Sequence, residues 1–462
     1  MKLLQIMSRP FVVFVERYYP EPFVFAILLT FLTFAITFTV TDTAPVQAMA
    51  AWGSGLASLL SFMAQLCIML ITAHALAHTD PLQKALKFLG RQPATQPGAY
   101  LMVTLVAGFA SLLSWPLGLV SGAIMAQQVA LEGHKKGLRL HYPLLVASAY
   151  SGFVIWHMGY SASAPLFVAT PGNELEDMMG GIIPVSETIF APWNIATALI
   201  TLGLVALTCA LMRPRDQDIL EIPETAINAL EKLDKKELEK EEAGDSPSHL
   251  PSASSPAARL DNSRLIPLLS GGILLVYLIH WFVTKGLDLN LNIVNWSLLA
   301  LGLCLSRSAL HYVSLITNAS RTVTPILLQY PFYAGIMGLM AQSGLVSIMS
   351  DWFTSLATPH SLPFWAFISG GLVNFFVPSG GGQWAIQGPV FIEAAKNLNV
   401  DLPLVVMGIA YGDQWTNMIQ PFWTIPLLAI AGLHMRQIMG YTFVILLVTF
   451  VTFSAGLFFA AL

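Results

Sequence analysis

The apolar segment 363–397 is interrupted in its middle by Val377-Pro378-Ser379-Gly380-Gly381-Gly382. Proline and successive glycines end helices, so we expect two shorter helices with a turn between them. The segment 99–131 is too long for one membrane-spanning helix and is broken in the same way by Ser114-Trp115-Pro116-Leu117-Gly118. Irregular backbone at membrane depth must be buried in protein or line a cavity. The sequence therefore predicts an all-α membrane protein with two helical hairpins.

The composition agrees with a protein embedded in lipid. Of 462 residues, 55% are hydrophobic and only 10% are charged, against roughly 25% charged in an average soluble domain. The chain lacks the alternation of an outer-membrane barrel, so we expect a multi-pass protein of the bacterial inner membrane. The net charge of −4 gives no indication of nucleic-acid binding. The other segments long enough to span a bilayer are 23–41, 54–77, 142–166, 189–212, 265–284, 292–306, 322–345, 403–430 and 437–460.

Basic residues predict the side of the membrane on which each segment ends. Lys84, Lys87 and Arg91 precede the segment 99–131, and further basic residues follow it, so both its ends are expected in the cytoplasm. We therefore predict about nine transmembrane helices, two re-entrant hairpins and a cytoplasmic N-terminus. This arrangement places 20 of the 22 Lys and Arg residues in the cytoplasm. The second hairpin, 363–397, then opens to the periplasm, opposite to the first.

The two halves of the chain share landmarks at a nearly constant offset. Pro116 and Pro378 mark the two breaks, and Ala149-Tyr150 recurs as Ala410-Tyr411. These and two further landmarks are offset by 260 to 264 residues. Landmarks in one order, with reversed predicted orientation, are typical of inverted-repeat transporters. The alternative is a chance alignment, because proline and Ala-Tyr are common in such chains.

The two predicted repeats cover residues 1–212 and 265–462. Between them, the segment 213–264 carries 20 charged residues and a stretch rich in Ser, Pro and Ala. Its apolar residues are too few to fold alone, so we predict a charged and disordered cytoplasmic linker.

The glycine-rich tip is the first candidate site. Successive glycines are costly in a helix, but they let backbone N–H groups approach a ligand at the N-terminus of the returning helix, where the dipole favours an anion. The alternative is close packing of the glycines against a neighbouring helix. The predicted substrate-binding residues at this tip are Ser379, Gly380, Gly381, Gly382, Gln383 and Trp384.

A polar cluster, Tyr411-Gly412-Asp413-Gln414-Trp415-Thr416-Asn417, interrupts the apolar segment 403–430. An ionisable residue at membrane depth is costly and is by default functional. We therefore predict that Asp413, with Thr416 and Asn417, binds a coupling proton or cation. The alternative is a neutral or capped Asp at a helix break.

The matching stretch of the first half, 150–165, contains no acid but offers His157, Ser161 and Ser163. Because histidine titrates near neutral pH, His157 is a second candidate for the coupling proton. The alternative is a hydrogen-bonded core residue.

The absence of basic residues at membrane depth in the hairpins and broken spans bears on the substrate. A dicarboxylate or phosphate would need such a residue. A monocarboxylate with a short apolar tail can instead be held by helix N-termini and serines, with tryptophans against the tail. The predicted lining residues beyond the glycine-rich tip are Ser114, Trp115, Trp156 and Trp415, and simple packing is the alternative for Ser114 and Trp115.

Three groups of residues resemble a known family. They are Phe375-Phe376-Val377-Pro378-Ser379-Gly380-Gly381-Gly382-Gln383-Trp384-Ala385-Ile386-Gln387-Gly388-Pro389, the cluster 411–417, and Ser8-Arg9-Pro10 with Tyr18, Pro20 and Pro22. They are similar to the bacterial short-chain fatty acid transporters associated with acetoacetate and butyrate uptake. The resemblance covers nearly the whole chain, with the linker around 216–262 its weakest part.

The resemblance implies membership of the wider ion-transporter superfamily. In that superfamily, hairpins and broken helices from two inverted repeats hold substrate and cation, often in a homodimer that moves by an elevator mechanism. Relatives with hairpin Ser-Asn-Thr motifs carry dicarboxylates with sodium. This chain lacks that triplet at its tips, so sodium coupling does not follow from the resemblance.

The sequence thus predicts a secondary active transporter that imports short-chain fatty acids or related monocarboxylates by cation-coupled symport. No GxxxxGK[ST], HExxH or GxSxG motif occurs, so neither an ATP-driven pump nor an enzyme is indicated. We expect no cofactor, a coupling H⁺ or Na⁺, and as partners the carboxylate, the lipid bilayer and, by the resemblance, a second copy of the chain. The alternatives are a transporter of another di- or hydroxycarboxylate and a passive carboxylate channel. The sequence leaves open the exact acid, the stoichiometry, any metal ion and any regulatory role of the linker.

Overall fold

The structure is a computed structural model of the chain, and it describes residues 22–58, 60–173, 175–232, 255–286, 289, 291–345, 348, 351–352, 355–376 and 380–462. Every regular element within these ranges is a helix, in agreement with the predicted all-α class. The predicted cytoplasmic N-terminus, the tip residue Ser379 and the middle of the linker lie outside the described residues.

The first half of the chain is a series of helices joined by short turns. Their bounds are α2 (Pro22–Val40), α3 (Pro45–Gly55), α4 (Leu60–Ala77), α5 (Asp80–Gly90), α6 (Gln96–Leu113), α7 (Trp115–Lys135), α8 (Tyr142–Gly152), the 3₁₀ helix η1 (Phe153–Met158), α9 (Ser163–Ala169), α10 (Glu176–Met179) and α11 (Pro192–Leu211).

The linker and the second half follow the same plan. Their elements are η2 (Asp216–Asp218), α13 (Pro256–Asp261), α14 (Leu265–Lys285), α15 (Leu291–Leu305), α16 (Ala309–Gln342), α18 (Leu362–Val373), α19 (Gly380–Leu398), α20 (Leu402–Thr416), η3 (Asn417–Ile419), α21 (Pro421–Ala431) and α22 (Met435–Ala460).

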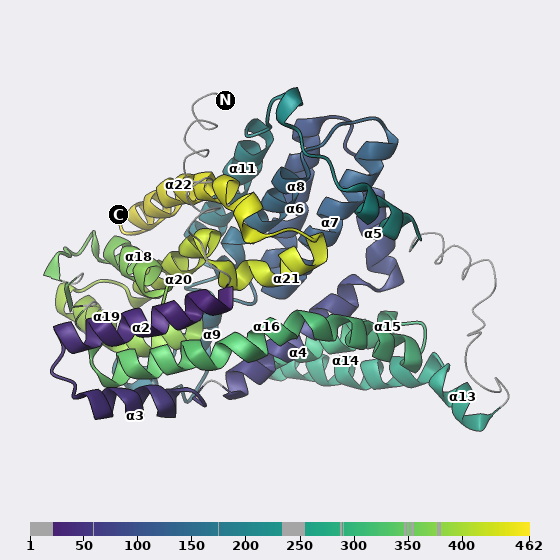
Figure 1. Cartoon of the computed structure of the whole chain (residues 1–462). Coiled ribbons are helices and arrows are strands. Elements are labelled where there is room, and N and C mark those ends of the chain that lie inside the picture. The colour runs from purple at the N-terminus through teal and green to yellow at the C-terminus, as the bar shows by residue number, and fades with distance from the viewer. Residues whose placement is uncertain are drawn as a thin grey trace.

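The long helices form two layers (Figure 1). In one layer, which we call the α16 layer, α16 packs against α2, α3 and α4, and α15 packs against α14 and α4. In the other, the core layer, α6 packs against α7, α8 and α11, α18 packs against α20, and α22 packs against α8, α11 and α20. Helix α5 joins the layers: it packs on α7, and its Asp80 pairs with Arg307, which lies between α15 and α16, with one Nη2–Oδ1 distance of 2.9 Å.

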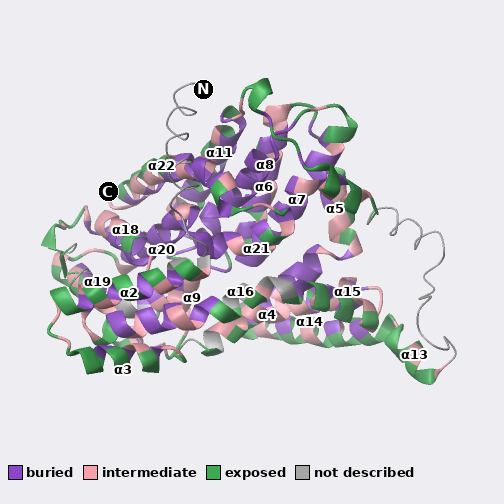
Figure 2. Cartoon of the chain, in the orientation of Figure 1, coloured by how far each residue is buried: buried purple, intermediate pink, exposed green. Residues whose placement is uncertain are grey.

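Exposed apolar surface marks the chain as a membrane protein. Four helices of the described residues are long and apolar enough to cross a membrane, namely α6, α11, α14 and α22. Ile273, Val276 and Val283 of α14 are 71%, 68% and 79% exposed. Figure 2 shows that buried residues gather instead in the core layer, around α6, α7, α8 and α20.

The first broken segment forms two helices that pack against each other. Helix α6 has 18 residues and α7 has 21, about 27 and 31 Å at 1.5 Å per residue, so each is longer than the expected half-helix. Ser114 between them is extended, and Pro116 occupies the first turn of α7, where its missing N–H is tolerated. A Cβ on Gly118 would lie 2.7 Å from Cα of Ser111, so only glycine lets the two helices approach this closely.

The second broken segment is less symmetric. Helix α18 has 12 residues, a turn covers 374–376, and α19 begins at Gly380 and has 19 residues. The described glycines therefore form the first turn of a helix.

Helix α16 begins well before the predicted segment 322–345. Its N-cap is Ser308, whose Oγ accepts from the His311 N–H at 3.1 Å. The segment 311–321 mixes polar with apolar residues, so its hydropathy does not indicate a membrane span, although no proline or glycine interrupts it. Two short helices, α5 and nearly all of α3, also lie outside the predicted segments because each is only 11 residues long.

The start of the linker docks onto the core layer. Leu220 accepts a hydrogen bond from the Tyr142 N–H at 2.8 Å, and its own N–H donates to Nδ1 of His141 at 3.0 Å. Arg139 pairs with Glu221 at 2.9 Å. Residues 213–232 therefore have a defined structure against the N-terminus of α8.

Candidate functional site

Two helix breaks, one from each half of the chain, meet in the core layer. Helix α8 passes into η1, and α20 passes into η3, and η1 packs against α20. At this junction Nδ1 of His157 lies 2.9 Å from Oδ2 of Asp413, and both side chains are 0% exposed. The contact has the distance of a charge-assisted pair but lacks the linear N–H···O alignment of a full hydrogen bond. The structure thus joins the two titratable residues that the sequence singled out separately.

Four further residues contact His157. Its backbone N–H donates to Oε1 of Gln414 at 2.9 Å. Its Nε2 lies 3.1 Å from Oγ of Ser163 and 3.2 Å from the backbone N of Ala164, both in the first turn of α9. The ring also stacks on Trp156, with centroids 4.1 Å apart. His157 is therefore held by residues of both α20 and α9.

Small residues position η1 against the first hairpin. A Cβ on Gly152 would lie 2.5 Å from the Thr104 carbonyl oxygen, and one on Gly159 would lie 2.3 Å from that of Leu112. Directly after η1, the Tyr160 N–H donates to the same Leu112 carbonyl at 2.8 Å. The close approach to α6 leaves no room for a side chain at either glycine and sets the place of His157.

Asn374, at the end of α18, organises the other side of the junction. Its Nδ2 lies 2.9 Å from the Asp413 carbonyl oxygen, 2.9 Å from Oγ1 of Thr416 and 2.7 Å from Oδ1 of Asn417. Thr416 in turn donates to the Gly371 carbonyl at 2.9 Å. The break in α20 is therefore built around one buried amide.

The glycine-rich tip reaches the same place. A Cβ on Gly380 would lie 2.1 Å from Cε1 of His157 and 2.4 Å from Oγ of Ser163. A Cβ on Gly381 would lie 3.7 Å from Cβ of Ser163, an ordinary contact distance. The N-terminal turn of α19 therefore rests on His157 and Ser163.

The other polar residue predicted at the tip, Gln383, turns toward α18. Its Nε2 donates to the Gly370 carbonyl at 2.6 Å and to Gln387 at 2.9 Å, and Gln387 donates to Ser369 at 2.8 Å. Trp384 is fully buried in an apolar cluster with residues of α9 and α10. These two residues hold the second hairpin in place, and neither has a described contact with His157.

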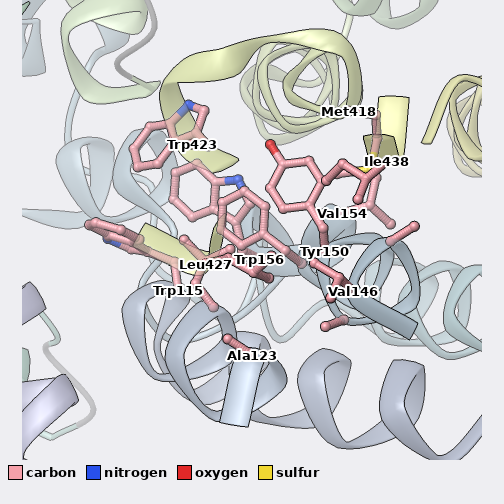
Figure 3. Close-up of a cluster of buried hydrophobic side chains, with 14 of the residues drawn as sticks. Trp115, Ala123, Val146, Tyr150, Val154, Trp156, Met418, Trp423, Leu427 and Ile438 are labelled. Carbon is pink, nitrogen blue, oxygen red and sulfur yellow. The ribbon is translucent and has the colours of Figure 1, made fainter. Parts of the chain in front are cut away.

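Trp156, which stacks on His157, belongs to a cluster of tryptophans. Trp115 and Trp156 lie against Trp423, with centroid distances of 4.9 and 5.6 Å. Figure 3 shows these three side chains within the buried cluster. The N–H of Trp115 donates to Oγ of Ser161 at 2.8 Å, which ties the first hairpin tip to the loop after η1. Ser114, the residue before Trp115, is buried, and its Oγ has no hydrogen-bond partner among the residues that the structure covers.

Trp415 lies elsewhere. Its Nε1 donates to the Leu446 carbonyl of α22 at 2.7 Å, and its ring packs on Phe367 and Phe450. It therefore belongs to the packing between α18, α20 and α22, away from the tryptophans around His157.

Several buried polar atoms around the junction have no hydrogen-bond partner within the part of the chain that the structure describes. Buried polar groups are normally paired, so atoms without protein partners are expected to contact a ligand, ion or water. They include His157 Nδ1, Asp413 Oδ1 and Oδ2, Asn374 Oδ1, Asn417 Nδ2, Gln414 Nε2, Gln420 Oε1, Gln383 Oε1 and Ser114 Oγ.

The sequence reading did not identify Asn374 or Gln414 as functional. Asn374 is the one amide side chain in the apolar run 363–376, and this exception could have indicated a role for it. Gln414 lies in the quoted cluster, but its role depends on a contact with a residue 257 positions away.

Comparison with known proteins identifies the class first: the chain is a membrane transporter rather than an enzyme. A model described as short chain fatty acid transporter matches residues 3–460, and the chain belongs to this family. A relative from Escherichia coli K12 is 39% identical over 444 residues, which cover 96% of this chain and 97% of the relative. One from Haemophilus influenzae is 37% identical, covering 99% and 100%. Both bear the name "Putative short-chain fatty acid transporter".

Solved structures resemble the fold at low sequence identity. MtrF of Neisseria gonorrhoeae, described within a class of antimetabolite efflux pumps, matches with a TM-score of 0.50 and 13% identity, covering 97% of this chain and 96% of that one. The YdaH transporter of Alcanivorax borkumensis, described as having an unusual topology, gives a TM-score of 0.49 and 17% identity, covering 96% and 98%.

Proposed function

We propose that the protein imports short-chain fatty acids or related monocarboxylates, such as butyrate and acetoacetate, across the inner membrane by cation-coupled symport with alternating access. The observation that carries this proposal is the buried His157–Asp413 pair, which receives one residue from each half of the chain and touches the glycine-rich turn at Gly380. An ionisable pair at such a crossing is the usual means of linking a cation to substrate movement.

The substrate carboxylate would bind at the N-terminal turn of α19. This turn presents backbone N–H groups and the positive end of the helix dipole beside the hydroxyl of Ser163. None of the described residues that contact His157 or Asp413 is Lys or Arg. Trp115, Trp156 and Trp423 offer an apolar surface for a short tail. This combination favours a monocarboxylate over a dicarboxylate.

We also propose that α6–α7 and α18–α19 are the two re-entrant hairpins of an inverted repeat with about nine spans. The paired breaks at η1 and η3 support this proposal, because each follows its hairpin and the next helix in the same order. A homodimer with elevator motion is the assembly that the family resemblance favours.

Uptake into proteoliposomes tests the function. Labelled acetoacetate is preferable to butyrate because it is the stronger acid, so less of it crosses the lipid unaided in neutral form. We expect saturable accumulation that depends on an imposed proton or sodium gradient, is absent in protein-free vesicles and is inhibited by butyrate more than by succinate. Flux that neither saturates nor responds to a cation gradient would indicate a passive channel. Inhibition mainly by succinate would indicate a dicarboxylate transporter.

A further inference from the structure

The hydrogen bonds of His157 determine where its proton lies. The backbone N–H of Ala164 approaches Nε2 at 3.2 Å, and a backbone N–H can only donate. Nε2 is therefore the unprotonated acceptor, and the hydroxyl of Ser163, 3.1 Å away, donates to the same nitrogen. His157 is thus the neutral tautomer with its proton on Nδ1.

Nδ1, which carries this proton, lies 2.9 Å from Oδ2 of Asp413, without the alignment of a full hydrogen bond. Two donors occupy the lone pair of Nε2, so an additional proton has no place on His157 in this conformation. Both carboxylate oxygens of Asp413 are buried, and neither has a hydrogen-bond partner among the described residues. The geometry therefore leaves Asp413 as the acceptor of one more proton.

The surrounding oxygens are less suited to a metal cation. Oγ1 of Thr416 and Oδ1 of Asn417 both accept from Nδ2 of Asn374, at 2.9 and 2.7 Å. The Asp413 carbonyl accepts from the same nitrogen at 2.9 Å. Three acceptors around one nitrogen fix the orientation of this amide, and the amide occupies the position where a cation would need those oxygens.

The other titratable groups around the pair are tyrosines. Tyr330 of α16 interacts electrostatically with Asp413, Tyr411 of α20 donates to Asn194 at 2.8 Å, and Tyr150 of α8 donates to the Asn417 carbonyl at 2.6 Å. The sequences of α9 and α18 contain no titratable residue. On the other helices packed around the junction, the charged residues lie toward the helix ends: Glu132, His134 and Lys135 on α7, Glu393 and Lys396 on α19, and Arg436 on α22.

We propose that the coupling ion is a proton, that it binds to the carboxyl group of Asp413, and that Ser163 and Ala164 keep His157 neutral while it does so. The inference rests on the proposed function, since it names the ion for that site. In the binding step, an O–H bond of a hydronium ion breaks, its proton forms an O–H bond with the carboxylate of Asp413, and a water molecule is released. Helix α9 packs against α19, so a movement of the glycine-rich turn displaces both donors from Nε2 and opens His157 to protonation. Ser163 is thus a positioning residue that links tip movement to proton binding.

The first test needs no substrate. Infrared difference spectra of the full-length protein in detergent are recorded as the pH is lowered at constant sodium concentration, for the parent and for Asp413→Asn. We expect a band of a protonated buried carboxyl group that the parent shows and the variant has lost. An unchanged band in Asp413→Asn would overturn the proposal.

The role of Ser163 is tested against a matched hydroxyl on the same helix. Ser163→Ala removes one donor to Nε2 and should shift the distribution of the proton between Asp413 and His157 about tenfold toward His157. The infrared band of the protonated carboxyl group should therefore weaken in Ser163→Ala. It should return in Ser163→Thr, which restores the hydroxyl. The control is Thr170→Ala, because Thr170 donates to the Leu166 carbonyl at the other end of α9. Identical spectra for Ser163→Ala and Thr170→Ala would overturn the positioning role.

Measuring proton uptake on substrate binding distinguishes a failure of the proton site from a failure of the proposed transport function. On adding acetoacetate in weakly buffered detergent solution, the parent should take up one proton per bound acid in sodium or potassium salt, while Asp413→Asn should take up none. Binding that requires sodium and takes up no proton would overturn the proton site and leave the function standing. Failure of any short-chain acid to bind, with the carboxyl band present, would reject the function and leave the proton site standing.

Discussion

At the scale of single residues, the site depends on contacts between side chains and backbone that are far apart in sequence. Gly380 lies against His157 and Ser163, and Asn374 bonds to three groups of the polar cluster. These residues are in the protein interior, where a polar group left without a partner lowers the free energy of unfolding by about 1–3 kcal/mol. The pattern explains why small changes at the tip should have large effects on binding.

A methyl group at Gly380 should weaken substrate binding far more than one at Gly381. In Gly380→Ala the new Cβ would lie 2.1 Å from Cε1 of His157, so the tip or the ring must shift, whereas in Gly381→Ala it meets Ser163 at 3.7 Å. We expect the half-saturation concentration for uptake to rise tenfold or more in Gly380→Ala, which corresponds to about 1.4 kcal/mol, and about twofold or less in Gly381→Ala.

Thermal unfolding in detergent checks that both variants fold. Equal effects of the two alanines on uptake would show that the tip does not approach His157 as closely as the structure has it.

Composition and hydropathy were sufficient to predict which polar residues lie at membrane depth. They did not predict which of these residues contact each other. Asp413 and His157 stand out because ionisable residues are rare in apolar segments. Their pairing could be inferred only through the repeat, which aligns the two breaks and says nothing of side-chain direction. Trp415 illustrates the limit, since it lies in the same cluster as Asp413 but its indole donates to α22.

At the scale of elements, hydropathy predicted helices well where they are long and apolar and poorly where they are not. Helix α14 matches its segment closely, while α16 starts in a polar stretch and α5 is a short amphipathic helix. The linker start could not be predicted, because its order comes from docking and not from its own composition. It is fixed by Leu220 and Glu221 against the N-terminus of α8.

Docking of the linker start should be lost in acid. Burial lowers the pKa of His141 from 6.5 to about 4, with a smaller opposing effect of Asp218. When the segment undocks, His141 regains its usual pKa and binds a proton below pH 6.5. In the docked state, His141 binds a proton only near pH 4. The contribution of neutral His141 to the free energy of docking is therefore fully present above pH 6.5. It is lost as the pH falls toward 4, and the loss is at most about 3 kcal/mol.

Hydrogen exchange of residues 213–232, corrected for the intrinsic effect of pH, measures this docking. Protection should fall by up to about a hundredfold between pH 7 and pH 4.5 in the parent. In His141→Asn, which does not titrate, the corrected protection should be independent of pH. A parent profile that is flat over this range would contradict the assignment of His141.

At the scale of the whole molecule, the two hairpins are expected to open toward opposite sides of the membrane. The outer ends of α6 and α7 carry Ala94 and Lys135, and those of α18 and α19 carry His360 and Asn397, all of them exposed. These four positions suit single cysteine substitutions. Gly137, which also follows α7, suits a cysteine less well because its φ of 69° favours glycine.

Single cysteines at these four positions, in a background without native cysteines, should label in two pairs. An impermeant maleimide should reach His360→Cys and Asn397→Cys in intact cells, and Ala94→Cys and Lys135→Cys only after permeabilisation. Labelling of the two ends of one hairpin from different sides would rule out a re-entrant arrangement for that hairpin.

The division of the site between the halves also affects how the protein is made. His157 and Gln414 are 257 residues apart, so at about 5–20 residues per second the ribosome needs about 10–50 s to add the second after the first. During this interval the first half is already in the membrane with the imidazole of His157 facing no carboxylate. The nascent chain must therefore either stay loosely packed around η1 or be protected there by another membrane component until α20 is inserted.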